Sequence, residues 1–459
     1  MASFVPVELK FRRGRFRQWS LLALYSVRIA LTSLEPFFNM GNPRLIVTAY
    51  DPHPNRGSEP GKAFAWAKAL SKFYEVHMIC ASEAADVCKR SGQCNEWVFH
   101  PLDIKRKPLP GLLHYFFYHQ WCHQLIPKCM EVIHEIKPVG LHHPIMGSFR
   151  MLPSYFRLQI PYTLGPLGGG ETAPFRLLRG SFLPMTEFVK ESFRPALNYA
   201  CLMNPQGRRV LREARMVLAT TQETEHLLRW AGAKATAVAF PDAIDLSQSP
   251  NDPLSTRLQQ REELRQNFRC IWSGRFLWWK GGQLAIHFVH CLRRAGCNAS
   301  LDIYSDGKGI DRLKQLAKDL DLETHVRFNG MVARTELLKA YLRAHLFVYP
   351  TLHDSSSSAI PEAYSTALPT FTLALGGTRV ATDPQAGLNQ TPRSIAEWLE
   401  QGTQLVKGWI ANPDGWLTAC AAAHKKRNSF LLDGIIATAR EHLCPCFDGT
   451  VSQSDSMQT

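Results

Sequence analysis

Asp354 and Glu362 are two carboxylates that stand eight positions apart in a stretch able to recognise a phosphorylated sugar. Between them lies a run of serines: Ser355, Ser356, Ser357 and Ser358. Such a loop offers backbone N–H groups and hydroxyls to an anion, while neighbouring carboxylates accept hydrogen bonds from sugar hydroxyls. Taken alone, an acidic loop residue and a helical glutamate are ordinarily solvated surface charges, so the rest of the chain must decide between the two interpretations.

The elements around this stretch predict where its side chains lie. Residues 346–350 and 370–375 are apolar and have the pattern of strands, and Pro361 suits the first turn of a short helix between them. This order is one unit of a doubly wound sheet, in which ligands bind at the carboxyl ends of the strands. We therefore expect Asp354 in the loop after a strand and Glu362 on the helix that follows.

Two cations, Arg275 and Lys280, lie in a glycine-bearing loop after the predicted strand 269–274. Both can neutralise a diphosphate, and cations placed where charge develops on a departing diphosphate lower the barrier to its departure. An isolated pair of this kind is ordinarily surface charge. Here the pair precedes the acidic stretch by two strand-and-helix units, so several strand ends can converge on one ligand.

The first half of the chain shows the same alternation of strands and helices. It opens with a strand at 45–50, a polar loop at 51–61, a helix at 64–74 and a strand at 75–81. Gly57 and Ser58 lie in that loop, at the carboxyl end of a strand. Two similar α/β halves in tandem predict a cleft between them, where substrates meet.

A second loop of the first half is rich in glycine. The predicted strand that begins at Pro161 ends in Gly168, Gly169 and Gly170, and Glu171 follows. Because these glycines lack side chains, their backbone can approach a ligand closely. A plain surface turn is the alternative.

Composition bounds the class of protein. The chain has 459 residues, enough for two domains, and its net charge of +14 favours an acidic partner: nucleic acid, an anionic membrane surface or a phosphorylated substrate. Nucleic acid ranks lowest, because no zinc-finger spacing or RNP-like aromatic strand is present.

Twelve irregularly spaced cysteines fit a reducing cytoplasm, and no set of residues completes a metal-ligand pattern. No run reaches the length of an apolar membrane span.

Residues 1–40 form a basic and then apolar N-terminal extension. Three interpretations stay open: a secretory signal, a basic amphipathic helix on a membrane surface, and an ordinary packing helix. A second segment, 177–215, is helical with alternating basic and apolar residues, and it can cover the cleft or touch a membrane.

With these pieces in order, the sequence resembles the retaining glycosyltransferases of the GT-B fold, in particular glycosyltransferase family 4. The matching pieces are SGRFLWWKGG, YSDGKG, VRFNGMV, LFVYPTLHDSSSSAIPEA, DPHPNRGSEPG and GPLGGGE. The resemblance implies two Rossmann-like doubly wound domains that face a central cleft. We expect an acceptor-side domain at 41–243 and a donor-side domain at 244–405. We expect C-terminal helices and a disordered tail at 406–459, packing back on the first domain.

The resemblance also implies catalytic roles for matching positions. Arg275 and Lys280 would hold the diphosphate of the donor and stabilise it as it leaves. Asp354 stands at the first acid of the family's two-acid motif and would bind hydroxyls of the transferred sugar. His143, or with less support His142, matches a first-domain histidine near the reacting sugar carbon. Transfer would retain the anomeric configuration without a metal or other cofactor.

Further positions would bind the donor or face the acceptor. Glu362 matches the second acid and would take the ribose hydroxyls. The other donor-side positions are Ser355, Ser356, Ser357, Ser358, Gly57, Ser58, Gly274, Asp306, Met331 and Val332. The acceptor-side positions are Gly168, Gly169, Gly170 and Glu171.

The sequence departs from the family pattern at several positions. Asp354 is shorter than the usual glutamate, Ala367 replaces a glycine, and the four serines replace a loop that commonly contains glycine. Two other functions therefore remain open: a sugar-nucleotide epimerase on the same scaffold, and a non-catalytic nucleotide-sugar-binding protein. The expected partners are a nucleoside-diphosphate sugar and a glycan, lipid or small-molecule acceptor, with no nucleic acid. The expected place is the cytoplasm, with peripheral contact to the anionic inner face of the membrane.

Overall fold

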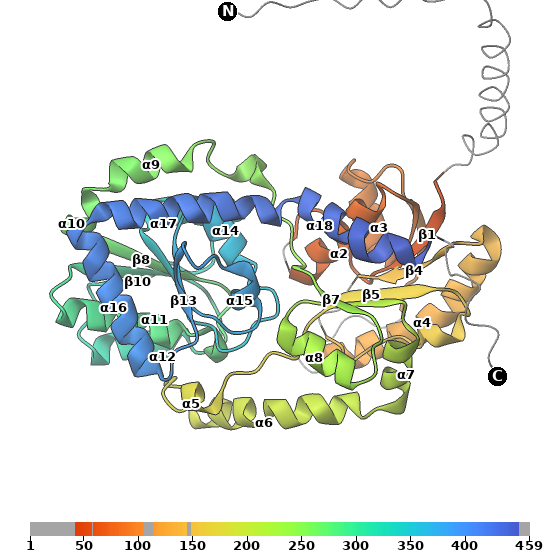
Figure 1. Ribbon diagram of the computed structural model, residues 1–459, viewed down its shortest axis with the longest axis horizontal. Helices are drawn as coiled ribbons and strands as arrows, with labels where there is room; N and C mark the ends of the chain where they lie inside the picture. The colour runs from red at the N-terminus through yellow and green to blue at the C-terminus, as the bar shows by residue number, and fades with distance from the viewer. Residues whose placement is uncertain (1–41, 57, 105–112, 145–147, 449–459) are drawn as a thin grey trace, which may run out of the picture. The chain divides into compact units, whose positions relative to one another are not determined.

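The computed structural model describes residues 42–56, 58–104, 113–144 and 148–448. These residues form two α/β domains, each built on a parallel sheet with helices on both faces (Figure 1). The predicted α/β class with two doubly wound domains is confirmed. The N-terminal extension 1–40 lies outside the described residues.

The first described sheet has seven strands in the order β3-β2-β1-β4-β5-β6-β7. The strands are β1 (Arg44–Thr48), β2 (Glu75–Cys80), β3 (Val98–Pro101), β4 (Gly140–His143), β5 (Tyr162–Leu167), β6 (Met216–Ala219) and β7 (Thr236–Val238). The helices around it are α2 (Ser58–Leu70), α3 (Ser82–Arg90), α4 (Leu113–Ile136), α7 (Pro205–Glu213) and α8 (Gln222–Trp230). Successive β1 residues alternate between two cores, since Leu45 and Val47 pack with Trp66 and Ile46 packs with Trp121. This alternation shows that both faces of the sheet are covered.

The second described sheet has six strands in the order β10-β9-β8-β11-β12-β13. The strands are β8 (Phe268–Ser273), β9 (Ala299–Tyr304), β10 (Val326–Phe328), β11 (Leu346–Tyr349), β12 (Thr370–Leu373) and β13 (Gly387–Gln390). Its helices are α9 (Pro253–Gln260), α10 (Glu263–Gln266), α11 (Gly282–Arg294), α12 (Ile310–Asp319), α13 (Arg334–Arg343), α14 (Ala359–Ser365) and α15 (Gly377–Ala381). Because β8 and β11 are neighbours, the loops after them meet at one edge of the sheet.

Two segments connect the domains. The short helix α5 (Phe175–Leu178) follows the first domain in sequence, but Leu177 and Leu178 are buried in the core of the second domain. The long helix α6 (Met185–Leu202) then leads back, and both helices run along the lower edge of the molecule in Figure 1. Most of segment 177–215 is helical as expected, whereas residues 179–184 between α5 and α6 are not.

The C-terminal segment crosses between the domains later than expected. Helix α16 (Ile395–Ala411) spans the expected boundary at 405, and it packs with α17 (Pro413–Lys426) on the second domain. The return to the first domain starts at α18 (Leu432–Thr438). Residues 444–448 were expected to belong to a disordered tail, and this expectation is wrong. Cys444–Cys446 forms a helical turn, and Phe447 is buried against the first domain.

Arg257 is a buried cation that joins three helices of the second domain. Its guanidinium on α9 donates to the carbonyl of Tyr341 at 3.0 Å and to that of Leu342 at 3.1 Å, in the last turn of α13. It also donates to the carbonyl of Thr366 at 2.9 Å, directly after α14. Carbonyls at helix C-termini carry partial negative charge and lack partners in their own helix, so they compensate a buried cation. Burial lowers the pKa of Arg257 to about 10, which leaves the side chain charged at neutral pH.

We predict that Arg257→Met lowers the free energy of unfolding by about 3 kcal/mol, because several buried carbonyls lose their donor. Urea denaturation measures this change. Arg312→Met is the matched control, since Arg312 is exposed on α12, and it should change the value by less than about 0.5 kcal/mol. Equal effects of the two substitutions would contradict this role of Arg257.

Candidate functional site

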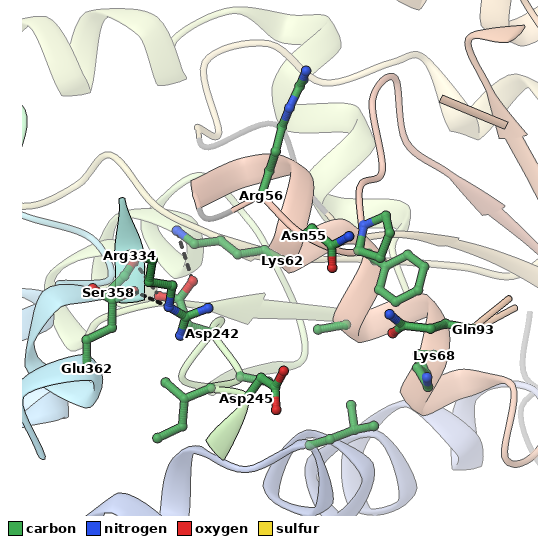
Figure 2. Close-up of a pocket in the computed structure, with 17 residues that line it drawn as sticks. Asn55, Arg56, Lys62, Lys68, Gln93, Asp242, Asp245, Arg334, Ser358 and Glu362 are labelled. Atoms are coloured by element: carbon green, nitrogen blue, oxygen red, sulfur yellow. Dashed lines mark hydrogen bonds and ion pairs between the residues drawn. The ribbon is translucent and has the colours of Figure 1, made fainter. Parts of the chain in front are cut away.

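A cavity of about 310 Å³ lies between the two domains (Figure 2). Its walls come from α2 and the loop before it, from residues 242–245, and from the starts of α13 and α14. The charged and polar side chains that line it are Asn55, Arg56, Lys62, Lys68, Gln93, Asp242, Asp245, Arg334, Ser358 and Glu362. In Figure 2 Lys62 extends from its helix toward Asp242 and Ser358, while Arg56 points away from them. The predicted cleft between two α/β domains is therefore present, and Glu362 and Ser358 line it.

Lys280 and Asp354 meet at the edge where the loops after β8 and β11 converge. Lys280 Nζ lies 3.5 Å from Asp354 Oδ2 and donates to the hydroxyl of Tyr349 at 2.8 Å. That hydroxyl in turn donates to Asp354 Oδ2 at 2.8 Å. Burial alone would raise the pKa of Asp354, but the Lys280 charge and the Tyr349 hydrogen bond outweigh it and hold the pKa below its ordinary value. The site therefore contains an ionised carboxylate beside a cation at neutral pH.

Glu362 sits on the first turn of α14 and is paired across to α13. Arg334 Nε lies 3.3 Å from Glu362 Oε1. Burial raises the pKa of Glu362, the Arg334 charge opposes that shift, and the nearby Asp242 adds to it. Glu362 thus lines the cavity, and its carboxylate is paired with the partly exposed Arg334.

Lys62 is a buried cation that reaches from the first domain into the serine loop of the second. Its side chain is only 4% exposed, and its Nζ donates to Ser356 Oγ at 2.7 Å. Carboxylates of Asp242 and Glu59 each lie 3.8 Å from Nζ. Burial lowers the pKa of Lys62, but these carboxylates outweigh it and raise the pKa above its ordinary value. The lysine is therefore charged and ties the two domains together.

The serine loop contacts the first domain through its hydroxyls. Ser358 Oγ donates to Asp242 Oδ2 at 3.0 Å, so Lys62 and Asp242 hold two of the four serines between them. Burial raises the pKa of Asp242, against the effect of the Lys62 charge. Ser357 is buried, and its hydroxyl has no hydrogen-bond partner among the described residues. The four serines are expected to present backbone N–H groups to a ligand, and the structure shows in addition that the hydroxyls of Ser356 and Ser358 contact first-domain side chains.

Two departures from the family's glycines fall where the backbone is left-handed. Ser357 has a φ of 51° and Ala367 has a φ of 55°. A side chain in this region costs about 1 kcal/mol relative to glycine. Ala367 ends α14 with the turn that a glycine usually makes, donating its N–H to the carbonyl of Tyr364 at 3.0 Å. The loop therefore keeps a backbone suited to glycine although its residues have changed.

The glycine cluster of the first domain is explained by packing. A Cβ at Gly168 would lie 2.5 Å from the Cβ of Ser355, and one at Gly170 would lie 2.7 Å from the Cα of Thr224. Gly169 has a φ of 105°. The absent side chain at Gly168 thus allows the first-domain loop to press directly on the serine loop of the second domain, while that at Gly170 allows close packing on α8.

Glu171 fixes that glycine loop. Its carboxylate is buried and accepts hydrogen bonds from Gly169 N at 2.9 Å, Thr221 Oγ1 at 2.9 Å and Thr224 Oγ1 at 2.7 Å. Most of the hydrogen bonds that this carboxylate can accept are therefore made within the protein. The Glu171 side chain holds the glycine loop in place.

The two histidines lie inside the first domain. His143 Nδ1 is 2.9 Å from Thr48 Oγ1 and 3.0 Å from the hydroxyl of Tyr155, and Nε2 is 3.3 Å from the hydroxyl of Tyr118. Burial lowers the pKa of His143 to about 4 and that of His142 to about 3, so both rings are neutral. The structure does not bring His143 into the cavity of Figure 2, because its strand is central in the sheet and both ring nitrogens have partners.

The remaining donor-side positions lie on exposed loops. Arg275 is exposed and has no hydrogen bond or ion pair within the part of the chain that the structure describes. Gly274 before it has a φ of 137°, and the carbonyl of Asp306 accepts the N–H of Phe276 at 3.2 Å, which joins these two loops. Met331 and Val332 are exposed just before α13. Gly57 and the side chain of Ser58 lie outside the described residues.

A second link between the domains comes from α6. Glu191 Oε2 lies 2.8 Å from His353 Nδ1, and both side chains are buried. The ring of His353 stacks on Trp279 with centroids 4.1 Å apart. His353 directly precedes Asp354, so α6 supports the loop that carries the first acid.

Lys62 and Asp242 were not singled out from the sequence. A signal for Lys62 exists, because it shares a helix face with Trp66 and Leu70 at four-residue spacing, and both of these are fully buried. A charged residue on a buried face points to a buried partner. Asp242 lies next to the expected boundary between the two domains, and nothing local in the sequence distinguishes it.

The described residues show neither a metal-ligand cluster nor a membrane-spanning helix. They contain no group of three or more histidine, cysteine, aspartate or glutamate side chains placed to hold a metal ion. No helix within the described ranges is long and apolar enough to cross a membrane.

Comparisons with known proteins agree with this geometry. Residues 267–407 match the family described as Glycosyl transferases group 1. The matched region is similar to that family and runs from β8 into α16. It contains the Lys280–Asp354 pair and Glu362, and the two-domain architecture around it is the GT-B fold.

One curated relative and two solved structures illustrate the likeness. A Mycobacterium tuberculosis GDP-mannose-dependent alpha-(1-6)-phosphatidylinositol monomannoside mannosyltransferase is 28% identical over 120 residues, which are 26% of this chain and 31% of that protein. Sucrose-phosphate synthase from Thermosynechococcus elongatus aligns with a TM-score of 0.59 at 16% identity, over 87% of this chain and 98% of that chain. Anabaena HepE, in complex with UDP and glucose, aligns with a TM-score of 0.57 at 15% identity, over 87% and 99%. The chain thus covers 31% of the length of that curated relative.

We predict that Lys62→Met lowers the free energy of unfolding by about 3 kcal/mol, because Asp242 is left buried without its cation. Adding Asp242→Asn should recover at least about 1 kcal/mol of that loss, which a double-mutant cycle in urea measures. Lys72→Met is the control, since Lys72 is exposed just after the same helix. Strictly additive losses in the cycle would show that the two side chains do not interact.

Proposed function

We propose that the chain is a glycosyltransferase that moves a sugar from a nucleoside-diphosphate sugar to an acceptor hydroxyl. The observation that carries this proposal is the convergence of Lys280 and Asp354 at one sheet edge, with Glu362 on the helix that follows. A cation suits the diphosphate, and the two carboxylates suit the hydroxyls of a sugar and of a ribose. The match to the glycosyl transferases group 1 family supports the same reaction class.

In this proposal the donor diphosphate lies between Arg275 and Lys280. Arg275 is exposed and has no partner in the described part of the chain, so it can bind phosphate oxygens without breaking an existing contact. Lys280 is held by Tyr349 and Asp354, which fixes its charge in place before the donor arrives. Preorganised cations of this kind stabilise the charge that develops as the diphosphate leaves.

The two acids divide the recognition of the donor. Asp354 accepts hydrogen bonds from hydroxyls of the transferred sugar. Its carboxylate is ionised, and the hydrogen bond from Tyr349 fixes the position of Oδ2. Glu362 accepts the ribose hydroxyls, with Met331 and Val332 framing the base just before α13. Arg334 then moves aside or shares the carboxylate, because it contacts one oxygen of Glu362 in the structure described here.

The acceptor approaches from the glycine loop of the first domain. A hollow of about 430 Å³ beside Gly170 is lined by α6, α8 and Arg379 of the second domain. An acceptor hydroxyl delivered from that side attacks the sugar carbon on the face from which the diphosphate departs, its proton passes to the departing diphosphate oxygen, and the configuration is retained. The side-chain cations balance the leaving charge, so the proposed reaction needs no metal ion.

We predict that Lys280→Met and Asp354→Asn each lower kcat about 100-fold or more, because each removes a charge positioned for the transition state. The assay is transfer from a panel of nucleotide sugars to glycan and lipid acceptors, with products identified by mass spectrometry. Asp311→Asn, on an aspartate that is 97% exposed, is the control. An isomerised sugar nucleotide formed without acceptor would identify an epimerase, and donor binding without turnover would identify a binding protein.

We also predict that donor affinity falls as the pH is lowered through the pKa of Glu362, since burial raises that pKa and makes the side chain bind a proton at higher pH than an ordinary glutamate. A protonated Glu362 loses one acceptor for the ribose hydroxyls, so binding is strongest above the raised pKa. Calorimetric titration with an intact nucleotide sugar measures this, because a free nucleotide carries a terminal phosphate that itself titrates near about pH 6. Glu362→Gln should bind more weakly and with a flat profile, and an unchanged slope in that variant would assign the titration elsewhere.

A further inference from the structure

Helix α6 is amphipathic, but polar residues lie on its inward side and apolar residues on its outward side. Its inward positions include the polar Glu191 and Asn198, which are buried. Its outward positions repeat every four residues and are apolar: Met185, Val189, Phe193 and Leu197, between 44% and 74% exposed. A helix that only packs on its own domain shows the opposite arrangement, with apolar residues inward.

The apolar surface extends beyond α6. We call it the α6 face; it consists of Phe175, Phe182, Met185, Val189, Phe193, Leu197 and Met203, all exposed. Figure 1 shows α5 and α6 on the lower edge, with no other described element beyond them. Contiguous exposed apolar side chains of this extent mark a site of interaction with a partner.

The charges around the α6 face favour an anionic partner. Arg176 and Arg179 are exposed and have no ion pair within the described ranges, whereas Lys190 is paired with Glu187 at 2.6 Å. A second copy of the chain would bring the same two arginines against one another in a symmetric contact. Residues 1–17 carry five lysines and arginines, so this segment is also repelled.

Aromatic residues at the end of α6 complete the pattern. Tyr199 and Trp230 are both partly exposed and contact edge to face with centroids 5.0 Å apart. Tyrosine and tryptophan gather where an apolar medium meets water and head groups. The face is a convex helix surface with a basic border, which fits the plane of a bilayer better than a groove-bound peptide.

We propose that the α6 face docks the protein on an anionic lipid membrane. The apolar side chains enter the boundary between head groups and acyl chains, and Arg176 and Arg179 meet lipid phosphates. This docking stands on the exposed residues alone and does not depend on the reaction that the protein catalyses.

The flank of the same helix borders the proposed site, and this step rests on the proposed function. Pro195 and Tyr199 line the hollow beside Gly170, and Glu191 holds His353 next to Asp354. An acceptor carried on a lipid can therefore enter that hollow from a membrane bound at the outer side of α6. The acceptor class that follows is a lipid-linked hydroxyl.

The experiment is co-sedimentation of the full chain with vesicles of phosphatidylcholine containing phosphatidylglycerol. Replacing Met185, Val189, Phe193 and Leu197 together by serine should weaken binding about tenfold or more, because each loses an inserted apolar group. Arg176→Gln with Arg179→Gln should weaken it several-fold, and added salt should do the same to the wild type. Met130→Ser with Leu258→Ser is the control, since these exposed apolar residues lie on α4 and α9.

Other occupants give distinct results. Equal pelleting of the four-serine variant and the wild type overturns the proposal, as does loss of binding only when Arg12, Arg13, Arg15 and Arg17 are changed to serine. A wild-type dimer that the four-serine variant converts to a monomer, with no vesicle binding by either, assigns the face to a second copy. Donor binding measured on the same variants tests the proposed function separately, because none of the four outward residues lines a cavity described above.

Discussion

The contact between Lys62 and the serine loop is the interaction on which the arrangement of the site depends. It places a charged ammonium from the first domain against Ser356, with Asp242 beside it, at a depth where water cannot compensate either charge. The contact holds the loop that carries Asp354 against the glycine loop of the other domain. The fit there is close enough that even a methyl group at Gly168 would collide with Ser355.

Support for the same loop comes from both sides. From the second domain, Tyr349 and Lys280 engage the carboxylate of Asp354. From the first domain, α6 reaches the preceding residue through the Glu191–His353 contact. The loop with the first acid is thus the meeting point of α2, α6 and two strand ends. That convergence explains how a serine-rich sequence with a left-handed Ser357 keeps a defined shape.

Helix α6 serves two surfaces at once. Its polar side is consumed by contacts that support the cleft, which leaves its apolar side outward. In an isolated domain that arrangement would expose apolar surface to water at a cost in free energy and solubility. This arrangement fits a protein whose working position lies against another apolar phase, and the hollow beside Gly170 borders the same helix.

Much of the fold could be predicted, since buried parallel strands read as short apolar runs. Residues 45–50 and 269–274 correspond to β1 and β8, and the strand, loop and helix around Asp354 are as expected. No strand was predicted from the sequence at β3, β7 or β13, and each of these strands is a sheet edge. Edge strands are short and only partly buried, so they lack the continuous apolar signal.

The sequence by itself determined the alternation of elements, the two domains, the loops that carry Lys280 and Asp354, and the helix that carries Glu362. Tertiary structure decided which charges meet. Lys62 and Ser356 are 294 positions apart, and His143 is enclosed by residues from three other segments. Local patterns report burial and periodicity along one element, whereas the partner of a buried charge is set by how distant elements pack. For that reason the sequence indicated Asp354 and Glu362 as site residues, but it did not indicate Lys62, the cation that contacts the serine loop between them.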